Sequence, residues 1–418
     1  MFDIDKWQEI FATISKHKLR TFLTALGVFW GIFMLVLLMG AGKGLENGVL
    51  GLFGNMAKNS MFLGTNRTSK PYKGLLPGRF LRLNMDDMNA IKNNFSDEVQ
   101  YLAPRMWMPS GEVSRGEKKG AFEMGGESPD LFKINPMEFL EGRMLNHFDM
   151  KEKRKVVVIG KRVREVLFEK DEEAVGEYIT FQGNDYRVIG VYRSDRRGEE
   201  GAEGAEDEEQ LYMPLTTVQK MRNRPNQVSM LSCSMYPDVS ATVLEPQILA
   251  MLKERHKVAP DDEQAFWTNN MEEEFGEVMG LFNGIAFIVW FVGIGSLMAG
   301  VIGVGNIMLI LVKERTKEIG IRKAMGATPQ SIVSMILLES VFITTIAGYL
   351  GLLTSTGLII LMAQAVGDGG DGYFANPEVD IEIGIIALII LIISGALTGL
   401  IPAMQAANIN PVQALKDE

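Results

Sequence analysis

The chain has 418 residues, of which 47% are hydrophobic and 22% are charged, and its formal net charge is -10 at pH 7. This acidic balance argues against nucleic acid as a partner, because phosphate binding requires a basic surface. The single cysteine, Cys233, excludes an intrachain disulfide and a cysteine-based zinc site. The apolar residues gather in four nearly charge-free stretches, which excludes a single soluble enzyme domain and indicates an integral membrane protein.

The N-terminal segment, residues 1–21, carries an apolar stripe at helical spacing beside basic residues. Such a helix lies at the membrane interface, so membrane lipid is an expected contact. The first span is predicted over 22–42, because about twenty uncharged residues rising about 1.5 Å each cross the hydrocarbon layer of about 30 Å. No clear small-residue cleavage site follows, so the span is interpreted as an uncleaved anchor.

Residues 43–277 are predicted to form a large α+β domain outside the membrane. Its expected elements are strands at 155–159 and 228–235, helices at 162–168 and 245–257, and a hairpin from 178–181 and 186–192. The acidic stretch 196–209 has no apolar period and is interpreted as a solvated, mobile loop, with calcium binding as the less favoured alternative.

Apolar stripes at helical spacing flank this domain on both sides. They comprise Leu45, Val49, Leu52, Phe53 and Met56 after the first span, and Met271, Phe275, Val278, Met279 and Phe282 at the second. The stripes favour two helices that pack on each other, or on a second copy of the chain, as a stalk. The alternative is that each stripe packs only on the α+β domain.

Three further spans are predicted at 278–312, 331–366 and 383–402. The segments between and after them are a short helix at 313–330, a loop at 367–382 and a tail at 403–418. Lys and Arg precede the first span and fill 313–330, whereas 367–382 has only acidic charges. By the positive-inside rule both termini and 313–330 face the cytoplasm, and 43–277 and 367–382 face outside.

No enzyme constellation is found in the sequence. Gly42-Lys43 and Gly160-Lys161 lack the hydroxyl and the glycine spacing of a Walker phosphate loop. The three histidines are scattered, and the Asp/Gly-rich loop at 367–378 lacks carboxylates at the early positions of an EF-hand. We therefore expect no enzymatic activity, no bound cofactor and no metal in this chain.

The segment 313–330 is a candidate contact site. Glu318 and Arg322 are four residues apart, which favours a helix, and Gly326 followed by Pro329 favours its end. One interpretation is a helix that docks on a cytoplasmic partner. The other is a basic loop that only sets the topology, and the residues alone do not decide between them.

Small residues recur at four-residue spacing in the spans and predict close helix packing in a narrow bundle, with a dimer as a further expectation. They are Gly27, Gly31, Ala299, Gly303, Gly395 and Gly399. Glu339 is the one ionisable residue inside a predicted span, at a depth of about 12 Å. We expect it to pair with Arg322 or Lys323, the alternative being a neutral carboxyl.

Residues 312–327, VKERTKEIGIRKAMGA, resemble the signature of the MacB/FtsX-type ABC transporter permease family. So do residues 401–415, IPAMQAANINPVQAL, and residues 18–27, KLRTFLTALG. Within the α+β domain, 139–144 and 158–160 are similar to the MacB-like core. The resemblance covers nearly the whole chain and implies a bundle of four transmembrane helices with a large extracytoplasmic domain between the first two.

This resemblance implies a bacterial inner-membrane permease that works as a dimer, with a second copy or a paralogue, together with two copies of an ATPase. With no ATPase domain in the sequence, the ATPase is expected to be a separate chain that holds the ATP and magnesium. The implied coupling residues are Glu314, Arg315, Lys317, Glu318, Ile319, Gly320, Ile321, Arg322, Lys323, Met325 and Gly326. A periplasmic adaptor and an outer-membrane channel are further expected partners of such a system.

Three hypotheses follow for the function. The first is ATP-driven motion of the outer domain in export of a peptide, drug, antibiotic or lipid-linked cargo. The second is an FtsX-like regulator that activates an extracytoplasmic cell-wall hydrolase, and the third is a passive receptor or scaffold without an ATPase. The size of the outer domain favours export.

Overall fold

The structure is a computed structural model that describes residues 18–54, 56–194, 207–366, 374–378 and 381–408. The predictions for the N-terminal stripe, for most of the acidic stretch and for the C-terminal tail from residue 409 lie outside the described residues. The chain divides into two compact units. The membrane unit comprises Met1–Gly48 and Leu281–Glu418, and the α/β unit comprises Val49–Gly280.

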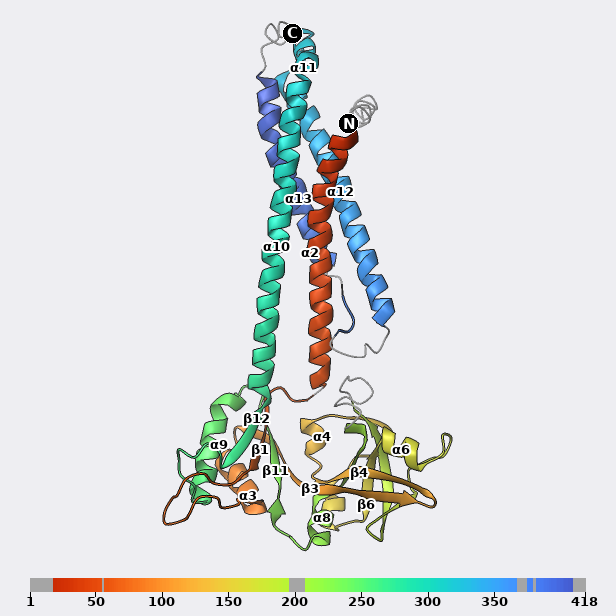
Figure 1. The fold of residues 1–418 in the computed structure, drawn as a ribbon, viewed down its shortest axis with the longest axis vertical. Coiled ribbons are helices and arrows are strands. Elements are labelled where there is room, and N and C mark those ends of the chain that lie inside the picture. The colour runs from red at the N-terminus through yellow and green to blue at the C-terminus, as the bar shows by residue number, and fades with distance from the viewer. Residues whose placement is uncertain (1–17, 55, 195–206, 367–373, 379–380, 409–418) are drawn as a thin grey trace. The chain divides into compact units, whose positions relative to one another are not determined.

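Four helices in the described part of the chain are long and apolar enough to cross a membrane (Figure 1). They are α2 (Lys18–Phe53), α10 (Met271–Glu314), α12 (Pro329–Val366) and α13 (Ile381–Ala407). A helix satisfies its backbone hydrogen bonds internally, which a lipid environment requires. The predicted fold class is confirmed: four membrane helices, with a large α/β unit between the first two along the chain.

Helices α2 and α10 approach closely at glycines. A Cβ atom on Gly300 would lie 3.1 Å from the Gly27 carbonyl oxygen, and one on Gly31 would lie 3.2 Å from the Ser296 oxygen. Within this chain, Ala299 is exposed and a Cβ on Gly303 would meet nothing within 4 Å, so close packing at these two residues stays a prediction. Gly300, one position after Ala299, is the small residue that faces Gly27 on α2.

Helices α12 and α13 meet at the other predicted pair of small residues. A Cβ on Gly395 would lie 3.0 Å from the Thr344 methyl group, and one on Gly399 would lie 3.2 Å from Ser340 Oγ. Ser340 Oγ also donates to the Gly395 carbonyl at 3.3 Å. Gly395 and Gly399 therefore allow the close approach that the sequence predicted.

The α/β unit contains a ten-stranded sheet in the order β12-β1-β11-β3-β4-β9-β6-β8-β5, with β7 paired to β3 and β8. The strands are β1 (Ser60–Thr65), β3 (Val99–Arg115), β4 (Lys118–Glu127), β5 (Glu138–Gly142), β6 (Val156–Gly160), β7 (Tyr178–Phe181), β8 (Asn184–Arg193), β9 (Gln210–Pro214), β11 (Met230–Met235) and β12 (Phe266–Asn270). Strands β2 (Leu83–Asn84) and β10 (Gln227–Val228) form a separate pair. The helices are α3 (Met85–Asn94), α4 (Leu131–Ile134), α5 (His147–Lys151), α6 (Lys161–Leu167), α8 (Leu215–Met221) and α9 (Ala241–Arg255).

The long strand β3 contributes side chains to one hydrophobic core and packs others against a second core. Its first half pairs with β11 and its second half with β4, and the change of partner falls between Arg105 and Met106. Arg105 is buried there beside Glu127 and lies 3.9 Å from the centre of the Trp107 ring. Burial raises the pKa of Glu127 to about 7, although the Arg105 charge acts in the opposite direction.

Most predicted strands and helices of this unit are found with shifted ends. The hairpin forms from β7 and β8 around Gln182 and Gly183, both with positive φ, as a tight hairpin turn requires. The strand predicted at 228–235 is interrupted at Ser229. Its N–H donates to the Arg105 carbonyl at 2.8 Å, and its hydroxyl accepts from the Trp107 N–H at 3.2 Å. These hydrogen bonds hold Ser229 between the two strands, so β10 ends at Val228 and β11 begins at Met230.

The two stalk stripes meet within the chain at Phe53 and Phe275, whose ring centres are 5.9 Å apart in an edge-to-face arrangement. Lys58 Nζ lies 4.4 Å from the centre of the same Phe275 ring. Met56 does not belong to the stripe, because α2 ends at Phe53 and Gly54 follows with a φ of 58°. A residue in this left-handed conformation stops the helix.

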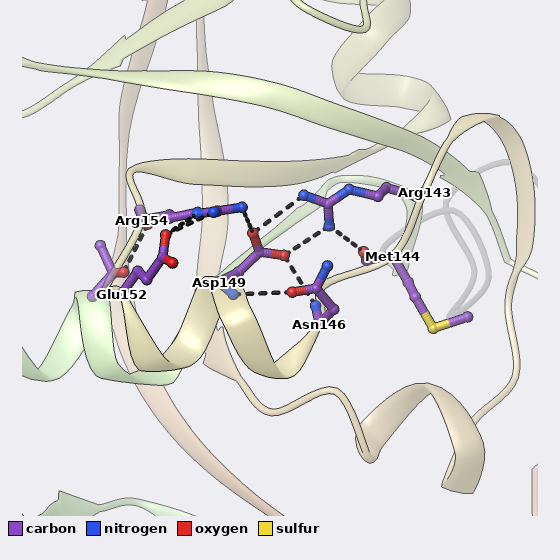
Figure 2. Close-up of polar contacts among 7 residues, drawn as sticks. Arg143, Met144, Asn146, Asp149, Glu152 and Arg154 are labelled. Atoms are coloured by element: carbon purple, nitrogen blue, oxygen red, sulfur yellow. Dashed lines mark hydrogen bonds and ion pairs between the residues drawn. The ribbon is translucent and has the colours of Figure 1, made fainter.

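A repeated local motif, Leu-Asn-x-x-Asp-Met, occurs at 83–88 and 145–150. In both copies the Asn side chain accepts from the backbone N–H of the Asp, and the Asp carboxylate accepts from the backbone N–H of the Asn. This reciprocal pair at the start of a helix is a capping box. Figure 2 shows the second copy: the buried Asp149 carboxylate accepts from Arg143 Nη1 at 2.7 Å and from Arg154 Nη1 at 3.4 Å. Burial alone would raise the pKa of Asp149, but the hydrogen bonds and charges of these partners keep it below its ordinary value.

Candidate functional site: the helix between the second and third spans

A short helix, α11 (Thr316–Ala324), lies between α10 and α12 in the membrane unit. Its start follows from Thr316, whose hydroxyl donates to the carbonyls of Val312 and Lys313 at 3.2 and 2.8 Å at the end of α10. Its end follows from Gly326, which has a φ of 100°, and α12 begins at Pro329. The predicted helix therefore forms, but it is shorter than the segment 313–330.

One face of α11 is packed against the bundle. Ile319 is 2% exposed and belongs to the same hydrophobic cluster as Val312, Ile332 and Ile336. Gly320 beside it is buried too. This face holds the helix against the ends of α10 and α12.

The opposite face of α11 is exposed and mixed in character. Ile321 is 43% exposed, and Met325 directly after the helix is 77% exposed. Lys317 and Glu318 are exposed one turn earlier. Residues four apart lie on the same side of a helix, so Lys317, Ile321 and Met325 form one apolar stripe with a charged end.

Glu339 pairs with Arg315, a residue that the sequence analysis did not name as its partner. Its Oε2 atom lies 3.2 Å from Arg315 Nη1, and the residue is 4% exposed. Arg315 is thus a partner of Glu339 that the expectation of Arg322 or Lys323 did not include. Arg315 stands at the junction of α10 and α11, from which it reaches Glu339 on α12.

Arg322 and Lys323 attach α11 to two other helices. Arg322 Nη1 lies 2.8 Å from the sulfur of Met335 on α12. Lys323 Nζ donates to the Ala407 carbonyl at 2.6 Å, at the last residue of α13. A lysine there satisfies a carbonyl that has no partner within the helix and complements the negative end of its dipole.

The predicted coupling residues thus divide into two groups. Arg315, Ile319, Gly320, Arg322 and Lys323 contact the bundle, while Lys317, Glu318, Ile321 and Met325 are exposed. Glu314 ends α10, and Gly326 forms the turn before α12. The structure therefore provides a helix fixed on one side and available on the other.

Sequence reasoning missed the Arg315–Glu339 contact, although both residues had been singled out. Within the described residues, no group of three or more His, Cys, Asp or Glu side chains could hold a metal ion.

Comparison with known families gives two matches that together span most of the chain. The family model described as MacB-like periplasmic core domain matches residues 21–259. The model described as FtsX-like permease C-terminal matches residues 278–411 and contains α11.

Similar proteins include the macrolide export ATP-binding/permease protein MacB of Campylobacter fetus, 28% identical over 97% of this chain and 60% of that protein. The MacB protein of Neisseria gonorrhoeae is 28% identical over all of this chain and 62% of its own length. The chain thus spans about 60% of the length of these curated relatives. The periplasmic region of MacB from Actinobacillus actinomycetemcomitans is a similar solved structure, with 20% identity, a TM-score of 0.44, and coverage of 57% of this chain and 98% of that one.

Proposed function

Since the chain belongs to the family with a MacB-like periplasmic core domain and an FtsX-like permease C-terminal domain, we propose that it is the permease subunit of an ABC transporter. A separate ATPase chain binds the ATP and magnesium and works in two copies. The permease pairs with a second copy or a paralogue. Both termini and α11 face the cytoplasm of a bacterial inner membrane, as the distribution of Lys and Arg supports.

The observation that carries this proposal is the two-sided arrangement of α11. A partner that moves a helix must grip an exposed face, and the helix must be fixed to what is to be moved. The stripe of Lys317, Ile321 and Met325 supplies the exposed face. Arg315 and Lys323 supply the attachment to α12 and α13.

In this proposal, ATP-driven closure of the ATPase pair displaces α11 and with it the membrane helices. The motion reaches the α/β unit through α2 and α10, which continue unbroken from the membrane unit into that unit. The α/β unit then acts outside the membrane in export of a peptide, drug, antibiotic or lipid-linked cargo. The names of the relatives, which specify macrolide export, are consistent with this class of cargo.

The test is co-purification of the ATPase with the tagged full-length chain from its native host. Met325→Glu and Ile321→Glu each place a charge in the apolar stripe, and we expect the affinity to fall by about 2 kcal/mol, or about thirtyfold. Val243→Glu is the matched control, since Val243 is a 67% exposed apolar residue on α9 of the α/β unit. Equal recovery of the ATPase with all three variants, or no ATPase with the unmodified chain, would refute the proposal.

A further inference from the structure

Two adjoining cavities lie between α2, α10 and α13 in the membrane unit. The first, of about 380 Å³, has a mixed lining that includes Lys43, Glu46 and Glu378. The second, of about 430 Å³, is lined by apolar side chains and by Ser394. Trp290 and Ile383 line both cavities, so the two form one groove with a polar end and an apolar end.

The polar end has a fixed structure. Lys43 Nζ lies 2.9 Å from Glu46 Oε1 on α2. The segment that carries Glu378 is attached to α2 by two hydrogen bonds, from Ala375 N–H to the Gly44 carbonyl and from Asn47 Nδ2 to the Asn376 carbonyl, both 2.9 Å long. One ammonium group and two carboxylates therefore stand together at this end.

This end coincides with one surface of the bilayer. The uncharged run of α2 ends just before Lys43, and the uncharged run of α13 begins at Ile383, directly after Glu382. Trp290 lies at the same level, because it lines both cavities with Ile383. Aromatic residues are enriched at the membrane–water interface, which agrees with this placement.

The apolar end is as deep as one leaflet. Along α13 the second cavity extends from Ile383 to Ser394, and along α10 from Trp290 to Ile302. At a rise of about 1.5 Å per residue, these stretches are about 16 and 18 Å long, close to half of the hydrocarbon thickness of about 30 Å. A helix of a second copy would cover the full thickness, whereas the acyl chain of a single lipid ends near the midplane.

We propose that this groove binds one zwitterionic phospholipid from the leaflet that borders Lys43. An acyl chain occupies the apolar cavity between Trp290 and Ser394. The phosphate lies beside Lys43, and the headgroup ammonium lies beside Glu46 and Glu378. Two carboxylates against one ammonium group disfavour a purely anionic headgroup.

The test is native mass spectrometry of the detergent-purified full chain, incubated with equal amounts of phosphatidylethanolamine and phosphatidylglycerol of matched acyl chains. We expect one retained phosphatidylethanolamine per chain, at about fivefold preference or more. Ala286→Trp fills the first cavity and should reduce retention about tenfold. Leu361→Trp is the matched control, since Leu361 is 62% exposed on α12 and lines neither cavity.

Glu46→Lys is a second variant, which reverses the charge at a partly exposed position and removes the ion pair with Lys43. The preference should then shift toward phosphatidylglycerol, while one lipid stays bound. Equal retention in Ala286→Trp and Leu361→Trp, or no headgroup preference in the unmodified chain, would overturn the proposal. So would efficient disulfide formation between two copies of a Met298→Cys variant, because a second copy would then cover the groove.

Discussion

At the scale of single residues, Asp87 illustrates how the α/β unit keeps a carboxylate ionised in its interior. The residue is 1% exposed and contacts Arg255 Nε at 3.0 Å and His256 Nε2 at 2.9 Å. Burial alone would raise its pKa, but the bonds from His256, Arg255 and the Asn84 backbone outweigh it and lower the pKa. Asp87 therefore contributes stability above its ordinary pKa, and this contribution is lost as pH falls through the lowered value.

We predict that Asp87→Asn lowers the free energy of unfolding by about 1–3 kcal/mol at pH 7, because Arg255 loses its carboxylate partner and His256 loses a hydrogen-bond partner. Cys233 provides the readout, since it is fully buried in the same core as Ile91 and burial raises its pKa to about 12. Its labelling by a thiol reagent should accelerate about 5- to 150-fold in the variant.

The control is Asp86→Asn, which changes the exposed neighbour and should leave the labelling rate unchanged. In thermal melts, the difference between Asp87→Asn and the unmodified chain should begin to shrink below about pH 4, where the carboxylate is protonated in the unfolded chain, and should be lost below the lowered pKa of the folded state. A difference that stays constant down to pH 2 would contradict the assigned role.

At the scale of elements, the crossing of α2 and α10 depends on which small residue of α10 faces α2. Sequence spacing selected Ala299 and Gly303, but Gly300 makes the contact. Successive residues in an α-helix are about 100° apart around the axis, so a shift by one position turns the contact to another face.

We predict that Gly300→Ala lowers the thermal midpoint of the detergent-purified chain, with a cost of about 1–3 kcal/mol, because the added Cβ meets the rigid Gly27 carbonyl at 3.1 Å. Gly303→Ala is the matched control, since its Cβ would have open space within the chain. Alanine also favours the helix by up to about 1 kcal/mol, so this variant should be neutral or more stable. A lower thermal midpoint for Gly303→Ala than for Gly300→Ala would refute the contact between α2 and α10 at Gly300.

At the scale of the whole molecule, the Arg315–Glu339 pair is the ion pair that joins the start of the proposed ATPase-binding helix to the interior of α12. Removing one member of a buried ion pair costs about 3–5 kcal/mol, because the other charge stays buried without compensation. The exposed stripe of α11 does not include either residue. Variants of this pair should therefore still bind the ATPase but should no longer transmit its motion to the α/β unit.

We predict that Glu339→Gln retains ATPase co-purification within about twofold. The ATP-dependent change in fluorescence of Trp107 and Trp267 in the α/β unit, measured with Trp7, Trp30 and Trp290 replaced by Phe, should fall about tenfold. The exchanged pair Arg315→Glu with Glu339→Arg should recover part of the signal, whereas either single change should not. An unaltered signal in Glu339→Gln would show that transmission bypasses this contact.

Several structural elements of this protein could be predicted from the sequence alone. The four membrane helices were predictable because long uncharged runs have one stable conformation in lipid. The short helix after α10 was predictable from Gly326 and Pro329, which act on the backbone locally. The capping boxes at Asn84 and Asn146 could also have been recognised from the Asn-x-x-Asp spacing.

Only the tertiary structure decided which of these elements touch, and through which side chains. Glu339 pairs with Arg315, and Gly300 replaces Ala299 at the crossing, because rotation and tilt of packed helices select the contact among several residues of suitable chemistry. The groove beside Trp290 likewise depends on three helices that are distant along the chain. Local patterns act within a few residues, whereas these contacts depend on how helices pack around one another in three dimensions.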